Sequence, residues 1–158
     1  MQLDFMRETS KKFPLMDNPE EVSEMRVWHC KFKSLESIKE CKNITKLVIA
    51  SLPDDSIAFL SELKQLRYLR ILHLPKITDL TPLKTLQSLE WLSLSTLPNW
   101  DSAGKVTKVE TLEPIAVIES LKYLELIGVC PPNKSLKALE QSKSILTARF
   151  TGFPKEEV

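Results

Sequence analysis

The sequence contains few cysteines, histidines and glycines, which often build catalytic, metal and phosphate sites. Its 158 residues include three cysteines, two histidines and three glycines. Cys30, Cys41 and Cys130 are odd in number and form no Cys-x-x-Cys pair, which argues against a disulfide framework or a zinc site and predicts reduced thiols. The three glycines are isolated from one another, so they form no phosphate-binding loop.

The chain also lacks long apolar runs and a charge imbalance. No run approaches 18 apolar residues, so we expect no membrane-spanning segment. Residues 1–21 have no uninterrupted apolar stretch followed by a small-residue cleavage site, which argues against a secretory signal. The 22 Lys and Arg residues nearly balance the 21 Asp and Glu residues, which argues against binding to nucleic-acid phosphates. These absences predict a soluble cytoplasmic protein.

A regular leucine pattern runs from Leu69 to Leu97. Leu72-x-Leu74 is followed by Ile77, and a second Leu-x-Leu occurs at Leu92 and Leu94. Between them, leucine recurs at every third position, at Leu80, Leu83, Leu86 and Leu89. A period of three fits neither a strand nor a long amphipathic helix. It predicts one coil of a solenoid, in which a short strand and a short helical segment send side chains to a common core.

Six copies of an apolar triplet predict six short strands. They are Val27/His29/Phe32, Leu47/Ile49/Leu52, Leu72/Leu74/Ile77, Leu92/Leu94/Leu97, Leu124/Leu126/Val129 and Ala148/Phe150/Phe153. The first residues of successive triplets are 20, 25, 20, 32 and 24 residues apart. The differences fall in one gap of each coil, of 2, 7, 2, 14 and 6 residues. A stacked core permits insertions at one corner only, so this restriction supports the solenoid.

The pattern resembles the leucine-rich-repeat family, especially its short bacterial internalin-like variety. The resemblance covers about residues 25–153 and implies an α/β leucine-rich-repeat solenoid. About six short parallel strands would form the concave face, and short helical or 3₁₀ segments the convex face. The family's usual Asn or Cys after the strand is replaced here by Phe32, Leu52, Ile77, Leu97, Val129 and Phe153. The turn amides must therefore be satisfied in another way, for example by water.

We expect a single domain over residues 1–158. Residues 1–24 show no repeat but contain enough apolar side chains to cover the open end of the first coil. Asn18 followed by Pro19 predicts a helix start within this N-terminal cap. Residues 25–153 would form the repeats, and residues 154–158 a tail that frays.

No convincing catalytic, cofactor or metal site is predicted. His29 occupies an inward position, where a hydrogen-bonded core histidine is the simpler interpretation. His73 would face outward. Together with Glu125 and Arg149 it could form a polar cluster only if the sheet curved tightly, and this leaves an enzyme as the less favoured alternative.

The outward side chains of the strands predict a binding surface. Side chains alternate along a strand, so the neighbours of the inward residues face the concave surface. Aromatic and aliphatic side chains gathered there would be unusual without a use, unless the cap or a loop covers Trp28 and Trp91. The 14-residue segment 98–111, which contains Trp100, is a second candidate surface. The predicted partner-binding residues are Trp28, Val48, Ile71, His73, Trp91, Ser93, Trp100, Tyr123, Glu125 and Arg149.

The resemblance implies a non-catalytic protein–protein recognition module. The small size, without an evident signal, anchor or second domain, favours a bacterial immunity or inhibitor protein that binds a toxin or effector. An adaptor that regulates an enzyme such as a phosphatase is the alternative. We expect a monomer or a weak homodimer, a protein partner, no cofactor, and neither a nucleic-acid nor a membrane partner.

Overall fold

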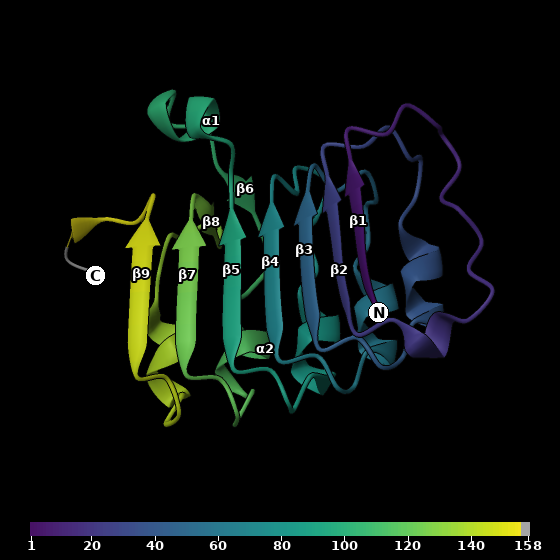
Figure 1. Cartoon of the computed structure of the whole chain (residues 1–158). Coiled ribbons are helices and arrows are strands. Elements are labelled where there is room, and N and C mark those ends of the chain that lie inside the picture. Colours follow the sequence, from purple (N-terminus) through teal and green to yellow (C-terminus); the bar gives the residue numbers. More distant parts are fainter. Residues whose placement is uncertain (156–158) are drawn as a thin grey trace.

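One parallel sheet organises the residues that the computed structural model describes, 1–155 (Figure 1). In sheet order its strands are β1 (Gln2–Met6), β2 (Glu24–Trp28), β3 (Lys46–Ala50), β4 (Tyr68–Leu72), β5 (Trp91–Ser95), β7 (Tyr123–Ile127) and β9 (Thr147–Thr151). The sheet order follows the chain order, so each coil adds one strand beside the last. This is the predicted α/β solenoid, with β1 as an additional strand.

Short helical segments form the layer behind the sheet (Figure 1). They are η1 (Pro19–Glu21), η2 (Glu36–Glu40), η3 (Ala58–Glu62), η4 (Thr81–Thr85), α2 (Glu113–Ala116) and η5 (Lys137–Gln141). The segment after β5 instead forms α1 (Pro98–Ser102), which projects beyond the end of β5, and β6 (Thr107–Lys108), which pairs with β8 (Val129–Cys130). In residues 1–155, no helix is long and apolar enough to cross a membrane.

The three-residue spacing of the leucines follows from the geometry of these segments. A 3₁₀ helix has three residues per turn, so residues three apart point in the same direction. Before β4, the amide of Leu63 donates to the Leu60 carbonyl (2.9 Å) and the amide of Leu66 to the Leu63 carbonyl (3.1 Å). All three side chains are fully buried. The pattern thus comes from successive 3₁₀-like turns that face the core.

Two predicted strands were out of register. The strands begin at residues 2, 24, 46, 68, 91, 123 and 147, which are 22, 22, 22, 23, 32 and 24 residues apart. The inward pairs are Met25/Val27 in the first predicted coil and Leu69/Ile71 in the third, in place of Val27/His29 and Leu72/Leu74. Leu66, Leu69 and Leu72 continue the three-residue spacing into the strand, so the leucines alone did not mark where the strand began.

A residue with positive φ follows most strands. These residues are Arg7, His29, Ser51, His73, Gly128 and Gly152. All but Gly152 donate their amide to a carbonyl of the next coil: for example, Ser51 N–H donates to the Leu72 carbonyl (2.7 Å) and His73 N–H to the Ser95 carbonyl (2.7 Å). Backbone carbonyls of the next coil therefore satisfy these turn amides, in place of the side-chain ladder of the family pattern.

The N-terminal segment closes its end of the core. Strand β1 pairs with β2, and Pro19 begins η1 as predicted. The loop after β1 places Phe13 between Phe5 and Phe32, with ring centroids 5.3 and 5.1 Å away. Phe13 is only 7% exposed although it lies in a loop. Residues 1–24 thus cover the first coil, partly as a strand.

The opposite end of the solenoid is open. In β9, Ala148 is exposed and Phe150 is only partly buried, and Leu146 just before the strand is 80% exposed. All residues of η5 are described, and none of them is buried. Of the predicted tail, residues 156–158 lie outside the described residues.

Candidate protein-binding surface

The face of the sheet turned away from the helical segments is called here the open face (Figure 1). The outward side chains form rows across it, because the strands are paired in parallel register. The first row contains Glu24, Lys46, Tyr68, Trp91, Tyr123 and Thr147, and the middle row Arg26, Val48, Arg70, Ser93, Glu125 and Arg149. Residues of one row are direct neighbours on adjacent strands, so each row acts as a continuous stripe.

Three stacked rings form what we call the aromatic ladder: Tyr68, Trp91 and Tyr123. The Tyr68 and Trp91 ring centroids are 4.2 Å apart with an interplanar angle of 6°, and those of Trp91 and Tyr123 are 4.9 Å apart at 7°. All three side chains are partly exposed. The strand spacing of about 4.8 Å is close to a stacking distance, so the register itself aligns the rings. The ladder is a rigid aromatic surface that exists before any partner binds.

A basic–aromatic hollow lies next to the ladder, over β1, β2, β3 and β4. Its volume is about 360 Å³, and its basic and aromatic lining residues are Arg26, Trp28, Lys46, Tyr68 and Arg70. The guanidinium carbons of Arg26 and Arg70 lie 6.0 and 5.8 Å from the Trp28 ring centroid. Lys46 Nζ lies 5.0 Å from the Tyr68 ring centroid. Cations thus rest on aromatic rings at this end of the open face.

A carboxylate network occupies the other end of the open face. Glu125 accepts a hydrogen bond from Ser93 Oγ (2.6 Å) and a longer one from the Tyr123 hydroxyl (3.4 Å). Arg149 forms an ion pair with the same carboxylate at 3.6 Å. Partial burial, and then the negative charge of Glu125, raise the pKa of Tyr123. The polar groups here largely satisfy one another.

Most of the predicted partner-binding side chains do lie on or near the open face. Trp28, Val48, Trp91, Tyr123 and Glu125 are partly exposed there, and Arg149 is exposed. Ile71 is an error caused by the register shift, because it is an inward residue of β4 and 0% exposed. Ser93 does face the open side, but its neighbours bury it completely, so it supports Glu125 and offers no surface to a partner.

His73 and Trp100 form a separate cluster at the ends of the strands. His73 lies in the left-handed turn after β4 and not in a strand, and its ring meets that of Trp100 edge-to-face, with centroids 5.1 Å apart. Lys105 Nζ lies 5.9 Å from the Trp100 ring centroid. Burial, and then the nearby His29, lower the pKa of His73. The long segment 98–111 is thus attached to the coil edge through its tryptophan, which is partly exposed.

The alternative polar cluster of His73, Glu125 and Arg149 is not assembled. His73 comes after the end of β4 and contacts Trp100, whereas Glu125 lies in the middle of β7 and binds Arg149. His29 was predicted to be a core histidine; it lies in a turn, where its Nδ1 is 2.6 Å from Ser51 Oγ. In residues 1–155, no group of three or more His, Cys, Asp or Glu could hold a metal ion.

The cysteines lie where a hydrocarbon side chain would fit. Cys41 and Cys130 are buried, and Cys30 is partly exposed. Burial is the first cause of the raised pKa of both Cys41 and Cys130. A raised thiol pKa disfavours the thiolate, which makes these two sulfurs poor nucleophiles.

Sequence reasoning missed Tyr68 and Arg70. Both were hidden by the register error in β4, which placed Ile71 and His73 on the open face in their stead. The available signal was the 22-residue spacing: counting 22 residues on from Lys46 and Val48 gives Tyr68 and Arg70. With Tyr68 and Arg70 placed in this way, the hollow follows from the sequence pattern, and Tyr68 extends the row of Trp91 and Tyr123.

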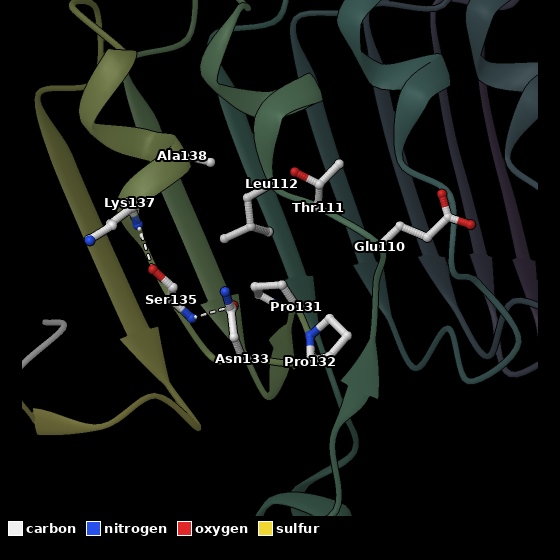
Figure 2. Close-up of a pocket in the computed structure, with 9 residues that line it drawn as sticks. All are labelled: Glu110, Thr111, Leu112, Pro131, Pro132, Asn133, Ser135, Lys137 and Ala138. Carbon is white, nitrogen blue, oxygen red and sulfur yellow. Dashed lines mark hydrogen bonds between the residues drawn. The ribbon is translucent and has the colours of Figure 1, made fainter.

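A second hollow lies on the other side of the molecule, between α2 and the turn before η5 (Figure 2). Its volume is about 390 Å³, and Leu112, Pro131 and Ala138 contribute its apolar wall. Asn133 and Ser135 are engaged in local turns, since the Ser135 amide donates to Asn133 Oδ1 (3.0 Å) and the Lys137 amide to Ser135 Oγ (3.2 Å), and the lining contains no aromatic ring. The open face therefore offers the stronger combination of aromatic rings and free charge.

Similar folds occur among solved structures, and two of them are internalins of Listeria monocytogenes. Internalin C2 matches with a TM-score of 0.51 and 19% identity, over 83% of this chain and 62% of its own. The internalin inlF matches with a TM-score of 0.53 and 15% identity, over 95% of this chain and 48% of its own. The chain has the leucine-rich-repeat fold.

The internalin resemblance is thereby confirmed at the level of the leucine-rich-repeat fold. Identities of 15–19% carry the fold and not the function. The chain spans between about half and three-fifths of the length of these two internalins. Searches of family profiles and of curated proteins found no match.

Proposed function

We propose that this leucine-rich-repeat protein binds another protein through its open face, in the cytoplasm and without chemistry of its own. The aromatic ladder is the observation that carries the proposal. Trp and Tyr are enriched at the energetic centres of protein interfaces. Rings already stacked on a rigid sheet lose little conformational freedom on binding, so more of their contact energy contributes to affinity.

The size of the open face defines what kind of complex it supports. Six strand spacings of about 4.8 Å and a strand height of about 16 Å give a flat area of roughly 460 Å². A standard interface buries about 800 Å² on each partner. The open face alone falls short of that size, so a tight complex requires a second region. Segment 98–111, with Trp100 exposed in part at the strand ends, is the nearest candidate.

Within this class we favour an inhibitor or immunity protein that covers the working surface of a toxin or effector. Such a protein acts by occupying a surface, which is what a rigid ladder with a flanking basic hollow can do. Regulation of an enzyme such as a phosphatase, as an adaptor, uses the same surface and differs only in the effect on the partner.

The first experiment is capture from the native host with the wild-type protein and Trp91→Ala as baits. We expect one stoichiometric protein with wild type, and about 30-fold weaker binding of that protein to Trp91→Ala, since hot-spot truncations cost about 2 kcal/mol or more. Val117→Ala is the control, because Val117 is 48% exposed next to α2 on the helical side. Equal affinities for all three proteins would remove the ladder from the interface.

The second experiment separates the inhibitor from the adaptor. The purified chain is titrated into an activity assay of the captured protein. An inhibitor abolishes that activity at a 1:1 ratio, whereas an adaptor leaves the turnover intact and changes which substrates are used. Cell fractionation of the native host tests the cytoplasmic location, which requires the chain and its partner in the soluble cytoplasmic fraction.

A further inference from the structure

The charges in the basic–aromatic hollow are unevenly satisfied. Arg26 is engaged by Asp4 through two hydrogen bonds, Nε to Oδ1 at 3.0 Å and Nη2 to Oδ2 at 2.6 Å. In contrast, Lys46 and Arg70 form no ion pair and no side-chain hydrogen bond with any residue in 1–155. Lys46 and Arg70 are therefore free to form ion pairs with a carboxylate of a ligand.

The remaining acids of the hollow do not neutralise it. Asp4 is committed to Arg26, and Glu24, which lies opposite Lys46 in the strand register, is not within ion-pair distance of it. The hollow thus contains three cations and two carboxylates. At the other end of the open face, Arg149 is already paired with Glu125. The excess positive charge of the open face is concentrated over β3 and β4.

Each of the two free cations lies over an aromatic ring of the hollow. The Arg70 guanidinium lies over Trp28, and the Lys46 ammonium lies over Tyr68. A guanidinium on an aromatic face keeps the donors in its plane available for a bidentate contact with a carboxylate. Arg70 is also partly buried, and partial burial strengthens a charge–charge contact relative to one in bulk water.

We infer that the basic–aromatic hollow binds an acidic segment of the protein partner, with carboxylates on Arg70 and Lys46 and apolar atoms against Trp28 and Tyr68. This inference rests on the proposed function and specifies the chemistry of the partner. The charge distribution favours a protein over a nucleic acid, because one hollow in a chain of net charge +1 provides no basic stripe that follows a phosphate backbone.

The test uses the full chain and a fluorescein-labelled peptide of eight glutamates, with fluorescence anisotropy at 20 and 150 mM salt. We expect binding at low salt that weakens at 150 mM, and about tenfold weaker binding to the double variant Lys46→Gln/Arg70→Gln. The matched control is Lys64→Gln/Lys76→Gln, which removes the same charge from exposed lysines outside the hollow. A neutral eight-residue Gly-Ser peptide and an eight-nucleotide oligothymidylate complete the set.

Three outcomes contradict the inference: no binding of the glutamate peptide, equal weakening by the two double variants, or tighter binding of the oligothymidylate. These outcomes are separate from a failure of the proposed function. If host capture yields a partner that binds Lys46→Gln/Arg70→Gln as well as wild type, the protein-binding function stands and the acidic-segment inference falls. If the glutamate peptide binds as expected but no partner is captured, the proposed function fails and the hollow's chemistry stands.

Discussion

The two ends of the solenoid differ in how completely their core side chains are covered. At the N-terminal end, β1 and the loop after it seal the first coil, and Phe13 packs between Phe5 and Phe32. At the C-terminal end, β9 and η5 leave Leu146 and Ala148 at the surface and Phe150 only partly covered. A stacked coil buries one face against its neighbour and needs something else for the other face. Residues 1–24 supply that cover at the N-terminal end, and no segment within residues 1–155 does so beyond β9, so we expect the stability of this described part to fall toward β9.

Removing one aromatic ring from each end should give the largest contrast. Phe13→Ala is expected to cost about 3–5 kcal/mol, as for buried phenylalanines in general. Phe153→Ala should cost only about 1 kcal/mol, since Phe153 is partly exposed and its ring meets Phe150 at the open end. Urea unfolding of the two variants measures this difference. Similar losses from both would mean that the C-terminal end is as well packed as the N-terminal end.

The turns after the strands provide a second contrast between the two halves. In the N-terminal half, the positive-φ position holds His29, Ser51 and His73, whereas in the C-terminal half it holds Gly128 and Gly152. At Gly128 a Cβ atom would lie 2.7 Å from Thr96 Oγ1. The C-terminal turns therefore need glycine for space, while the N-terminal turns tolerate side chains.

Gly128→Ala is accordingly expected to destabilise by about 2–4 kcal/mol, from left-handed strain together with steric overlap. Gly104→Ala is the matched control, because Gly104 also has positive φ (73°) but has nothing within 4 Å of an added Cβ. It should cost about 1 kcal/mol, from strain alone. Thermal unfolding of both variants separates strain from overlap, and equal losses would show that overlap with Thr96 is not the cause.

The smallest expected effect is the contribution of His73 to the pH dependence of the free energy of unfolding. The pKa of His73 is lowered from the ordinary 6.5, first by burial and then by His29, so the folded state favours the neutral ring. The unfolded chain therefore binds the proton more readily, and the free energy of unfolding should fall as pH falls from about 7.5 through 6.5 into the range below it. His73→Asn, which tolerates positive φ and does not titrate, should reduce this slope. Parallel slopes for the variant and wild type in urea unfolding would assign the pH dependence to other groups.

The leucine spacing was enough to predict the fold, because 3₁₀ turns and Leu-x-Leu strands place apolar residues at regular intervals in the sequence. It was not enough to fix the register of every strand. Leu72 and Leu74 satisfied the pattern as well as Leu69 and Ile71, since a run of threes and a strand overlap there. Strand β1 was missed because only Leu3 and Phe5 point inward, and the third position of the expected triplet is Glu8.

The candidate surface was predicted in outline and corrected in detail. Trp28 was placed on the open face despite the register error in β2, because a shift of two residues preserves the alternation along a strand. Trp91 and Tyr123 lie on strands whose register was predicted correctly. A shift of three residues exchanges the two faces, which is why Ile71 was predicted to be outward and Tyr68 was missed. The burial of Ser93 could not be read from alternation, since it depends on the size of neighbouring side chains and on Glu125.

The proposed function requires that the open face, rather than the helical side, contacts the partner. Site-directed photo-crosslinking to the captured partner tests it most directly, with benzoylphenylalanine in place of Val48 on the open face or of Lys64 away from it. We expect a 1:1 covalent product from position 48 and none from position 64. Crosslinking from position 64 alone would contradict the proposal and place the interface at the turn between η3 and β4.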